Sequence, residues 1–427
     1  MKKKDLRSKE WFDNPKDPGL TALYLERYLN YGLKREDLQS GKPIIGIAQS
    51  GSDLSPCNRH FQALSKTIKD GIREAGGIPI EFPTHPIQET GKRPTAGLDR
   101  NLSYLSLVEV LYGYPIDGVV LTTGCDKTTP AALMAAATVN IPSIVLSGGP
   151  MLDGSYKGKK AGSGTIIWEA RRLHAKGEIN YEEFMDMAAA SAPSIGHCNT
   201  MGTASSMNSI AEALGMSLTG GAIIPAPYKE RETISYKTGK RIVEMVHEDL
   251  TPSKIMTKQA FENAIYVASA IGASSNCPPH LEAIARHMGI DFGIDNWQKL
   301  GHDIPLLVNC QPAGEHLMEG FFKAGGIPAV MQELMKNNKL HKNLITVTGK
   351  TIEENLKEKI TIDKNVIKTF KEPLVKNAGF IVMKSNFFNS AVMKTSVISP
   401  EFRKRYLSNP KNPNIFEANA IVFEGPE

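Results

Sequence analysis

Three cysteines in short turns rich in glycine, proline and asparagine are the residues of this sequence with the clearest chemical potential. They are Cys57, Cys125 and Cys198. Thiolates are the usual protein ligands of iron–sulfur clusters, and three of them leave one iron coordination position open. The sequence therefore predicts that three turns from distant parts of the chain meet around such a cluster.

Asp126 and Lys127 follow Cys125 at the end of an apolar run. A buried carboxylate and a buried amine are costly unless they pair or bind a cation. One interpretation is an ion pair that closes a tight turn beside a structural cysteine. The other places a soft metal next to a hard one, with Cys125 on iron and Asp126 on Mg²⁺. Lys127 would then be a general base or, once carbamylated, an anionic oxygen ligand for Mg²⁺.

The other cysteines have weaker local signals. Cys198 precedes a predicted helix whose N-terminus favours a thiolate, although a buried capping residue has the same pattern. Cys57 stands three residues before His60, a spacing compatible with zinc, but the sequence has no second ligand pair at such a spacing. Cys277 and Cys310 have no adjacent acid or amine, so we expect both to be buried, unreactive thiols.

Loops supply the remaining candidates. Glu89 lies in a loop after an apolar run, where a surface glutamate is the default interpretation. The glycine-rich segments SGGPM (147–151) and GTAS (202–205) are predicted to shape a pocket for a substrate carboxylate with their backbone N–H groups. The sequence contains no G-x-G-x-x-G or Walker A loop, which argues against dinucleotides and nucleotide phosphates.

The elements that must position these turns alternate between strand and helix from Pro43 onwards. Short apolar runs predict strands at 43–48, 78–82, 117–123 and 143–147. The intervening segments predict helices at 60–75, 102–112 and 131–138. This alternation predicts an α/β fold with a largely parallel sheet covered on both faces. The turns around Cys57, Glu89 and Cys125 each follow a strand, at the edge where open α/β sheets bind ligands.

The rest of the chain divides into two regions. Residues 181–340 are predicted to be mostly helical, with helices at 182–190, 203–214, 257–270, 280–287 and 329–337. The later runs FIVMKS, SAVMKTSVI and AIVFEG are typical of strands. We therefore predict an N-terminal α/β domain over 1–370 and a β-rich C-terminal domain over 371–427. Three strands in so short a segment do not complete a domain, so we expect the second domain to be incomplete.

Composition is that of an ordinary globular protein, with 41% hydrophobic and 22% charged residues and a formal net charge of +5. The lysine-rich segments are scattered, which favours a solvated surface over nucleic-acid binding. No apolar stretch approaches the roughly 20 residues that span a bilayer, and the basic start is not followed by the apolar region of a secretory signal. Five widely spaced cysteines suit a reducing compartment, so we expect a cytoplasmic protein without membrane or nucleic-acid partners.

Several segments together resemble the dihydroxy-acid and sugar-acid dehydratases, a family that includes dihydroxyacid dehydratase and phosphogluconate dehydratase. They occur in order along essentially the whole chain: SDLSPCN, ETGKRPTA, DGVVLTTGCDKTTPA, SGGPM, GHCNTMGTASSMN, PAPYKER, AFENAI, DIPLLVNCQPAGE and TVTGKTIEEN. GCDKTTP and CNTMGTAS are the most specific of them. ETGKRPTA and PAPYKER are most similar to the sugar-acid branch, the L-arabinonate and D-xylonate dehydratases.

The resemblance implies a [2Fe–2S] cluster, with [4Fe–4S] as the alternative, held by Cys57, Cys125 and Cys198. It also implies Mg²⁺ bound by Glu89, Asp126 and a carbamylated Lys127. The implied fold is a large α/β domain followed by a β-barrel-like domain, assembled as homodimers or homotetramers. The family's catalytic serine and a further metal-binding glutamate lie in a C-terminal part without a counterpart here, so the resemblance implies a truncated and weakly active chain.

The implied activity is that of a hydro-lyase that converts a 2,3-dihydroxy sugar acid, such as a pentonate, to a 2-keto-3-deoxy acid. In such a reaction Mg²⁺ would stabilise the enediolate-like charge that forms at C2, and iron would assist the departing 3-hydroxyl. One alternative is a branched-chain dihydroxyacid dehydratase acting on 2,3-dihydroxyisovalerate. The others are a non-catalytic truncated subunit that pairs with a full-length partner, and a structural zinc protein.

Overall fold

A four-stranded parallel sheet is the centre of the computed structural model, which describes residues 5–88, 97–358, 360, 363–406, 419 and 421–422. The sheet consists of β1 (Ile44–Gln49), β2 (Ile78–Pro83), β3 (Gly118–Thr123) and β4 (Ser143–Ser147), in the order β2-β1-β3-β4. Every residue of β3 is buried, as expected for a strand covered on both faces. The four predicted strands and the α/β class with a parallel sheet are confirmed.

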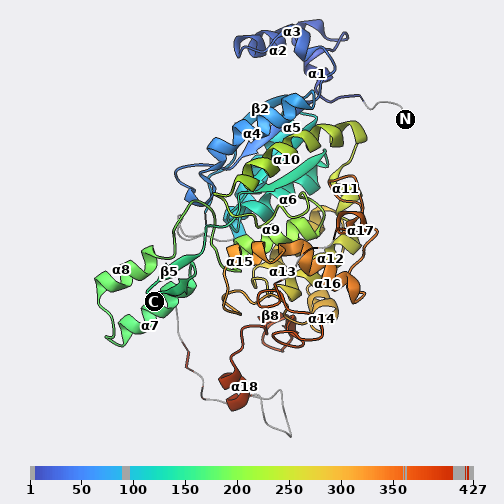
Figure 1. The fold of residues 1–427 in the computed structure, drawn as a ribbon. Coiled ribbons are helices and arrows are strands. Elements are labelled where there is room, and N and C mark those ends of the chain that lie inside the picture. Colours follow the sequence, from blue (N-terminus) through green and yellow to red (C-terminus); the bar gives the residue numbers. More distant parts are fainter. Residues whose placement is uncertain are drawn as a thin grey trace.

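Helices cover both faces of this sheet (Figure 1). α4 (Phe61–Glu74) follows β1, and α6 (Thr128–Val139) follows β3. The chain moves outwards from β1 to β2 and, in the opposite direction, from β3 to β4, so right-handed crossovers put α4 and α6 on opposite faces. α10 (Lys229–Glu248) packs on α4, and α5 (Gly97–Gly113) packs on α6. The change of direction lies between β1 and β3, where ligands bind in sheets of this kind.

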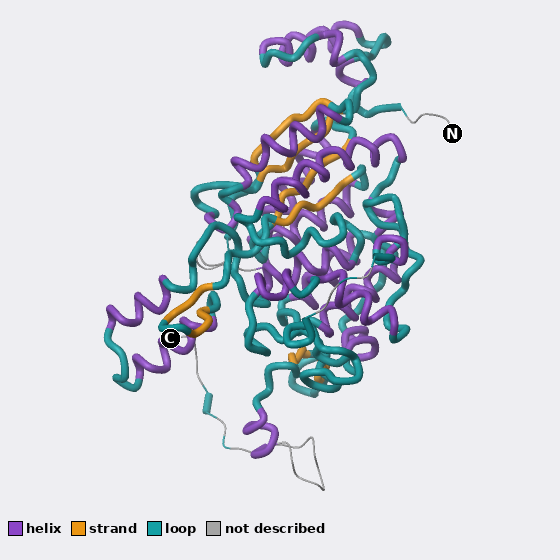
Figure 2. Tube along the Cα trace, viewed as in Figure 1, coloured by secondary structure: helices purple, strands orange, loops and turns teal. Residues whose placement is uncertain are grey.

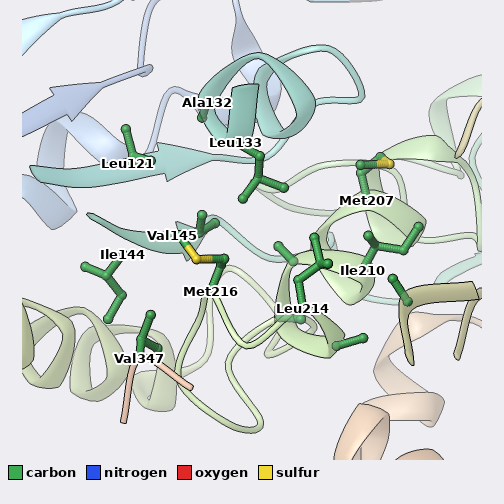
Figure 3. Packing of buried hydrophobic residues seen from close by; sticks show 14 of the residues in the cluster. Leu121, Ala132, Leu133, Ile144, Val145, Met207, Ile210, Leu214, Met216 and Val347 are labelled. Atoms are coloured by element: carbon green, nitrogen blue, oxygen red, sulfur yellow. The ribbon is translucent and has the colours of Figure 1, made fainter. Parts of the chain in front are cut away.

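A helical body shares one hydrophobic core with the sheet. α9 (Thr203–Ala213), α12 (Lys258–Ala270), α13 (Cys277–His287) and α16 (Gly326–Lys336) pack against one another. Figure 3 shows the junction, where Leu133 of α6 and Val145 of β4 lie in one buried cluster with Ile210 of α9. This packing fixes where α9 begins relative to the ends of the strands.

Smaller units lie at the periphery, and Figure 2 shows their short strands apart from the central sheet. The N-terminal helices are α1 (Lys9–Phe12), α2 (Pro18–Asn30) and α3 (Arg35–Leu38). A second unit with its own apolar cluster contains β5 (Gly154–Tyr156), β6 (Lys159–Ala161), α7 (Thr165–Ala175) and α8 (Tyr181–Ala189). The other described elements are η1 (Pro56–Asn58), α11 (Pro252–Ile255), α14 (Asp295–Gly301), α15 (Met318–Lys323), α17 (Ile352–Asn355), β7 (Phe380–Met383), β8 (Ala391–Lys394) and α18 (Pro400–Tyr406).

The C-terminal region contains an antiparallel pair, β7–β8, at two of the three runs predicted to be strands. Most of the third run, AIVFEG, lies outside the described residues. Phe380 of β7 packs edge-on against Trp297 of α14, with ring centroids 5.0 Å apart, and so joins the main core. The domain boundary near residue 370 and the barrel stay predictions. In the described ranges, no helix combines the length and apolar character needed to cross a bilayer.

Candidate metal centre

Two of the three cysteine turns come from neighbouring strands. Cys57 lies in the 3₁₀ turn η1, which follows β1, and Cys125 lies just after β3. Because β1 and β3 are adjacent and parallel, both turns leave the sheet at its carboxyl edge. Cys125 is buried and Cys57 is partly exposed. The structure thus brings these two residues to the edge where the sheet changes direction.

Polar side chains lock the two turns together. Asn58 is fully buried, and its Oδ1 faces Gly124, where a Cβ would collide with it. This close approach requires glycine immediately before Cys125. From the helical body, Asn208 of α9 accepts a hydrogen bond from Thr123 Oγ1 (3.1 Å) and donates one to Gly124 O (3.4 Å). The position of Cys125 is therefore set by both the sheet and α9.

The third cysteine reaches the same edge through the loop after β4. The His197 N–H donates to Gly149 O (3.0 Å), and the Met151 N–H donates to His197 O (2.9 Å). Gly196 has φ +124°, and a Cβ there would lie 2.6 Å from Met151 N, so this pairing needs glycine. Cys198 follows this short bridge and precedes α9. Its position consequently depends on the same core as that of Cys125.

The three thiols are close enough to perturb one another. The pKa of the Cys57 thiol is raised above its ordinary range by its interaction with Cys125, by burial and by the nearby Cys198. The Cys57 thiol therefore resists ionisation beside the other two thiols unless a cation is present to bind the thiolate. None of the five cysteines forms a disulfide, and all five lie within the described residues. This donor set therefore fits a metal group that binds several thiolates at once.

The geometry of the three thiols does not fit a single metal ion bound by all of them. In the part of the chain that the structure describes, no three His, Cys, Asp or Glu side chains surround one metal position. An iron–sulfur cluster distributes its thiolates over more than one iron atom, so its ligands need not converge on one point. The chemistry of the donors thus favours a cluster over an isolated ion at the thiols.

A buried ion pair lies beside the thiols. Lys127 Nζ donates to Asp126 Oδ2 at 2.9 Å, and each side chain is 7% exposed. The Cys125 thiol donates to the other oxygen, Asp126 Oδ1, at 3.7 Å. The ion pair matches the interpretation in which the two residues close a turn. The thiol–carboxylate contact is compatible with the other interpretation, in which a soft-metal ligand and a hard-metal ligand share one turn, and that interpretation stays a prediction.

Glu89 lies outside the described residues, together with the rest of 89–96. Its neighbour Gln88 is buried, and Gln88 Oε1 accepts a hydrogen bond from the Cys57 N–H (3.3 Å). The segment after β2 therefore reaches the same edge of the sheet as the turns after β1 and β3. Glu89 as a Mg²⁺ ligand stays a prediction.

His280 of α13, which the sequence analysis did not single out, lies near this ion pair. It is 5% exposed, and its Nδ1 lies 3.0 Å from Nη1 of Arg100 on α5. Burial, followed by the charges of Arg100 and Lys127, lowers the pKa of His280 to about 3, so the imidazole is neutral. A single histidine on a helix has no distinctive sequence pattern. Its position becomes visible only because α13 packs on α6, which begins directly after Lys127.

The expectation that the glycines of the SGGPM loop offer backbone donors to a substrate carboxylate is wrong for both of them. The Gly148 N–H donates to Thr123 O (2.7 Å), and the Gly149 N–H donates to Ser147 Oγ (3.2 Å). These groups hold the loop against the sheet instead. The loop therefore supports the Cys198 turn, and the similar expectation for GTAS stays a prediction.

Other candidate residues take structural roles. His60 Nε2 lies 2.8 Å from Gly148 O, which ties the ring to a backbone carbonyl and disfavours a zinc pair with Cys57. Burial lowers the pKa of His60 to about 4. Cys277 and Cys310 are buried as expected. Burial raises the pKa of the Cys277 thiol to about 12 and raises that of Cys310 as well.

Buried charges also support the loops behind the centre. Arg231 of α10 is fully buried and donates from Nη1 to Ser147 O at the end of β4 (2.6 Å). Glu212 of α9 accepts hydrogen bonds from the Gly220 N–H (2.7 Å) and the Ala222 N–H (2.9 Å). Burial raises the pKa of Glu212 to about 7, against the influence of these donors. Arg231 thus holds the end of β4, and Glu212 holds the loop that follows α9.

An α/β fold with grouped thiols and a buried acid–amine pair at the carboxyl edge of its sheet is the architecture of an enzyme. The family model for the N-terminal domain of dihydroxy-acid/6-phosphogluconate dehydratases matches residues 42–355. The chain belongs to this family, whose named relatives are dehydratases, and it is accordingly a hydro-lyase.

Three relatives illustrate the relationship. The chain is 62% identical over 421 residues to D-xylonate dehydratase of Caulobacter vibrioides, covering 99% of this chain and 71% of that protein. It is 43% identical over 430 residues to L-arabinonate dehydratase of Rhizobium leguminosarum bv. trifolii, covering 99% and 72%. It is 38% identical over 409 residues to dihydroxy-acid dehydratase of Caldanaerobacter subterraneus subsp. tengcongensis, covering 94% and 71%. The expected family and its sugar-acid branch are confirmed.

Proposed function

We propose that this protein dehydrates a five-carbon sugar acid, D-xylonate first among the candidates, to a 2-keto-3-deoxy acid. The observation that carries the proposal is the grouping of three thiols beside the buried Asp126–Lys127 pair. The substrate class is supported by 62% identity to a D-xylonate dehydratase, against 38% to a dihydroxy-acid dehydratase. A pentonate with its carboxylate and adjacent hydroxyls suits a site where hard and soft ligands adjoin.

The proposed ligand sets follow the grouping of donors. Cys57, Cys125 and Cys198 hold a [2Fe–2S] cluster, and Asp126, Glu89 and Lys127 as a carbamate hold Mg²⁺. When bound, these groups supply Lewis acids for the carboxylate and 2-hydroxyl on one side and the leaving 3-hydroxyl on the other. The Cys125–Asp126 contact fixes the separation of the two sites, because adjacent residues of one turn serve both.

The chain itself orients the reaction. β3 and α6 enclose the turn that contains Asp126, which limits its access to water. Low exposure strengthens every charge interaction with a bound substrate, since the local dielectric is lower than that of water. Asp126 and Lys127 are each 7% exposed, so the enediolate-like charge would develop in a desolvated and already ordered position.

We also propose a cytoplasmic homo-oligomer, either a dimer or a tetramer. α5 presents a stripe of exposed leucines at helical spacing, and they are 67%, 46% and 55% exposed at Leu98, Leu102 and Leu105. An apolar helix face of this kind supports a protein–protein contact. Size-exclusion chromatography with light scattering tests this proposal, and a monomeric chain at micromolar concentration contradicts it.

The function is tested by anaerobic purification, with iron and acid-labile sulfide quantified. D-xylonate, L-arabinonate and 2,3-dihydroxyisovalerate are then assayed for keto-acid formation. The assay is run on this chain and on a version joined to the C-terminal part of D-xylonate dehydratase. We expect bound iron and sulfide in both forms and faster turnover of the pentonates than of 2,3-dihydroxyisovalerate. Absence of iron and sulfide from both forms would refute the cluster, and preference for 2,3-dihydroxyisovalerate would refute the substrate class.

A further inference from the structure

The Arg100–His280 contact fixes which nitrogen of the imidazole carries the proton. A guanidinium has only donors, so Arg100 Nη1 donates and His280 Nδ1 accepts, at 3.0 Å. The neutral ring must then carry its proton on Nε2. That N–H is buried and, within the described ranges, has no hydrogen-bond partner. His280 therefore holds an unused donor of fixed tautomer next to the metal centre, and buried donors seldom lack an acceptor.

The surroundings identify the kind of acceptor. Arg100 on α5 donates to Asn101 Oδ1 and to His280, and in the described part of the chain it forms no ion pair with a carboxylate. α5 and α13 both pack on α6, whose first turn follows Lys127. Arg100, Lys127 and the N–H of His280 thus lie near Asp126, and Asp99 of α5 is a second buried carboxylate in this part of the chain. A buried N–H without an acceptor, next to the charge of Arg100, favours an anionic acceptor at this place.

Carbamylation of Lys127, which the proposed function includes, creates that anion. The ammonium first gives one proton to water. The neutral amine then attacks CO₂, its lone pair forms the N–C bond, one C–O π pair moves to oxygen, and the nitrogen gives a second proton to water. The charge at this position changes from positive to negative beside Asp126. Two neighbouring anions repel each other in a buried site unless a cation and hydrogen-bond donors compensate for them.

We propose that His280 is a positioning residue whose Nε2–H donates to the carbamate oxygen of Lys127 and holds it towards Mg²⁺. Arg100 fixes the tautomer that makes this donation possible. Histidine and carboxylate groups behind metal ligands commonly orient them in this way, and their loss typically weakens metal binding by about 10–100-fold. This inference rests on the proposed Mg²⁺ site and goes beyond it by assigning a residue of α13 to the ligand's support.

Substitutions can separate the two nitrogens of His280. The amide nitrogen of His280→Gln reaches the place of Nε2 and keeps the donor, whereas that of His280→Asn reaches only the place of Nδ1. His287→Gln is the matched control, because His287 lies on the same helix and its Nδ1 lies 3.0 Å from Thr138 Oγ1, away from Lys127. Cluster absorbance and melting temperature report whether each variant is folded.

The experiment measures two properties besides activity. Carbamate on Lys127 is detected by ¹³C NMR after incubation with ¹³C-bicarbonate, with Lys127→Met as the blank, and Mg²⁺ affinity is measured by calorimetric titration. We expect His280→Asn to lose carbamate signal and to bind Mg²⁺ about 10–100-fold more weakly. His280→Gln should stay within about threefold of wild type in Mg²⁺ affinity, since it keeps the Nε2 donor. His287→Gln should equal wild type.

Three outcomes would overturn the inference. One is an unchanged carbamate signal and Mg²⁺ affinity in His280→Asn, including the case where only the KM for the sugar acid rises. Another is an equal loss in the Gln and Asn variants that follows their melting temperatures, which would indicate a purely structural histidine. The third is wild-type protein that contains its cluster and dehydrates pentonates without any carbamate on Lys127. That result would leave the dehydratase function standing and remove only the carbamate ligand.

Discussion

Removing one member of the Asp126–Lys127 ion pair should destabilise the metal-free chain far more than removing one member of an exposed ion pair with the same N–O distance. The pair is 2.9 Å long and both side chains are 7% exposed. Deleting one partner of such a buried pair leaves an uncompensated charge and costs about 3–5 kcal/mol. At roughly 2.1 cal/mol/K per residue, a chain of this length unfolds with an entropy near 0.9 kcal/mol/K, so Asp126→Ala and Lys127→Met should each lower Tm by about 3–6 °C.

The chain offers a matched control for distance. Lys160 and Asp153 also form an ion pair of 2.9 Å, but their side chains are 40% and 22% exposed. Exposed pairs contribute about 0–1 kcal/mol, so Lys160→Met should lower Tm by no more than about 1 °C. The assay is thermal unfolding followed by circular dichroism, on protein prepared without iron and magnesium. Single variants at Asp126 and Lys127 that melt within 1 °C of the Lys160 control would show that burial does not govern the pair.

The double variant Asp126→Ala/Lys127→Met distinguishes the two interpretations of the pair. Replacing both charges by apolar groups removes the uncompensated charge, so most of the lost stability should return. If the pair only closes a turn, this variant keeps its metals and its turnover. If Asp126 and Lys127 are Mg²⁺ ligands, the variant recovers its Tm but binds no Mg²⁺ in a calorimetric titration. Recovery of both properties would refute the ligand assignment.

Three further predictions concern single residues. Cys57→Ser should abolish the visible absorbance of the cluster in anaerobically purified protein, and Cys310→Ser should keep it. Loss of absorbance in both variants would contradict the assignment of Cys57 as a ligand and Cys310 as an unreactive thiol. Burial raises the pKa of Glu212 from 4.5 to about 7, so the folded state binds more protons than the unfolded state in this range and stability falls as pH rises from 4.5 through 7. The loss amounts to roughly 3 kcal/mol, and the melting temperature of Glu212→Gln should vary less between pH 5 and pH 8 than that of wild type. Leu133→Ala, in the fully buried cluster of Figure 3, should cost about 2–5 kcal/mol in urea unfolding, and a loss below 1 kcal/mol would mean that the site collapses around the cavity.

The sheet could be predicted because its strands carry their signal locally. DGVVLTT is a continuous apolar run, and the strand Gly118–Thr123 is buried on both faces as such runs predict. Gly76 ends α4 with φ +85°, a conformation for which glycine is the usual residue. Strand, turn and helix signals agree with one another along this part of the chain. That agreement is why the order of elements was readable without any long-range information.

α10, by contrast, was not predicted, although it has 20 residues. Gly239 in its middle suggests a weak point, since glycine disfavours helix interiors. In the structure Gly239 lies where α10 crosses α4 at Gly71, and a Cβ on either residue would collide with the backbone of the other helix. Close packing of the two helices therefore requires glycine at position 239. The residue that explains this requirement, Gly71, lies 168 positions earlier in the chain. No local pattern carries that information.

The candidate site likewise contains residues that could be predicted from local sequence and residues that could not. The turns around Cys57, Cys125 and Cys198 were predicted from their own composition, and the structure brings all three to one edge of the sheet. The role of His280 was not accessible, because Arg100, which fixes its tautomer, lies 180 positions away and no pattern links them. Residues that bind directly tend to occupy distinctive turns, whereas residues that support them are distributed over helices and identified by packing.

The arrangement of the three cysteine turns also predicts that substitutions near them affect metal affinity more than they affect the stability of the fold. Each cysteine turn is held by bonds that do not involve sulfur: the Cys57 N–H to Gln88, Asn208 to Gly124, and His197 to Gly149. The core therefore brings the thiols together before any metal binds, although the neighbouring thiols oppose the ionisation of Cys57. A bound cation stabilises the thiolates and so removes this opposition. Because the folded core already holds the thiols close together, less free energy is needed to order them when the metal binds, and the metal affinity is higher. Substitutions that loosen any of these three backbone contacts should consequently weaken cluster binding before they unfold the chain.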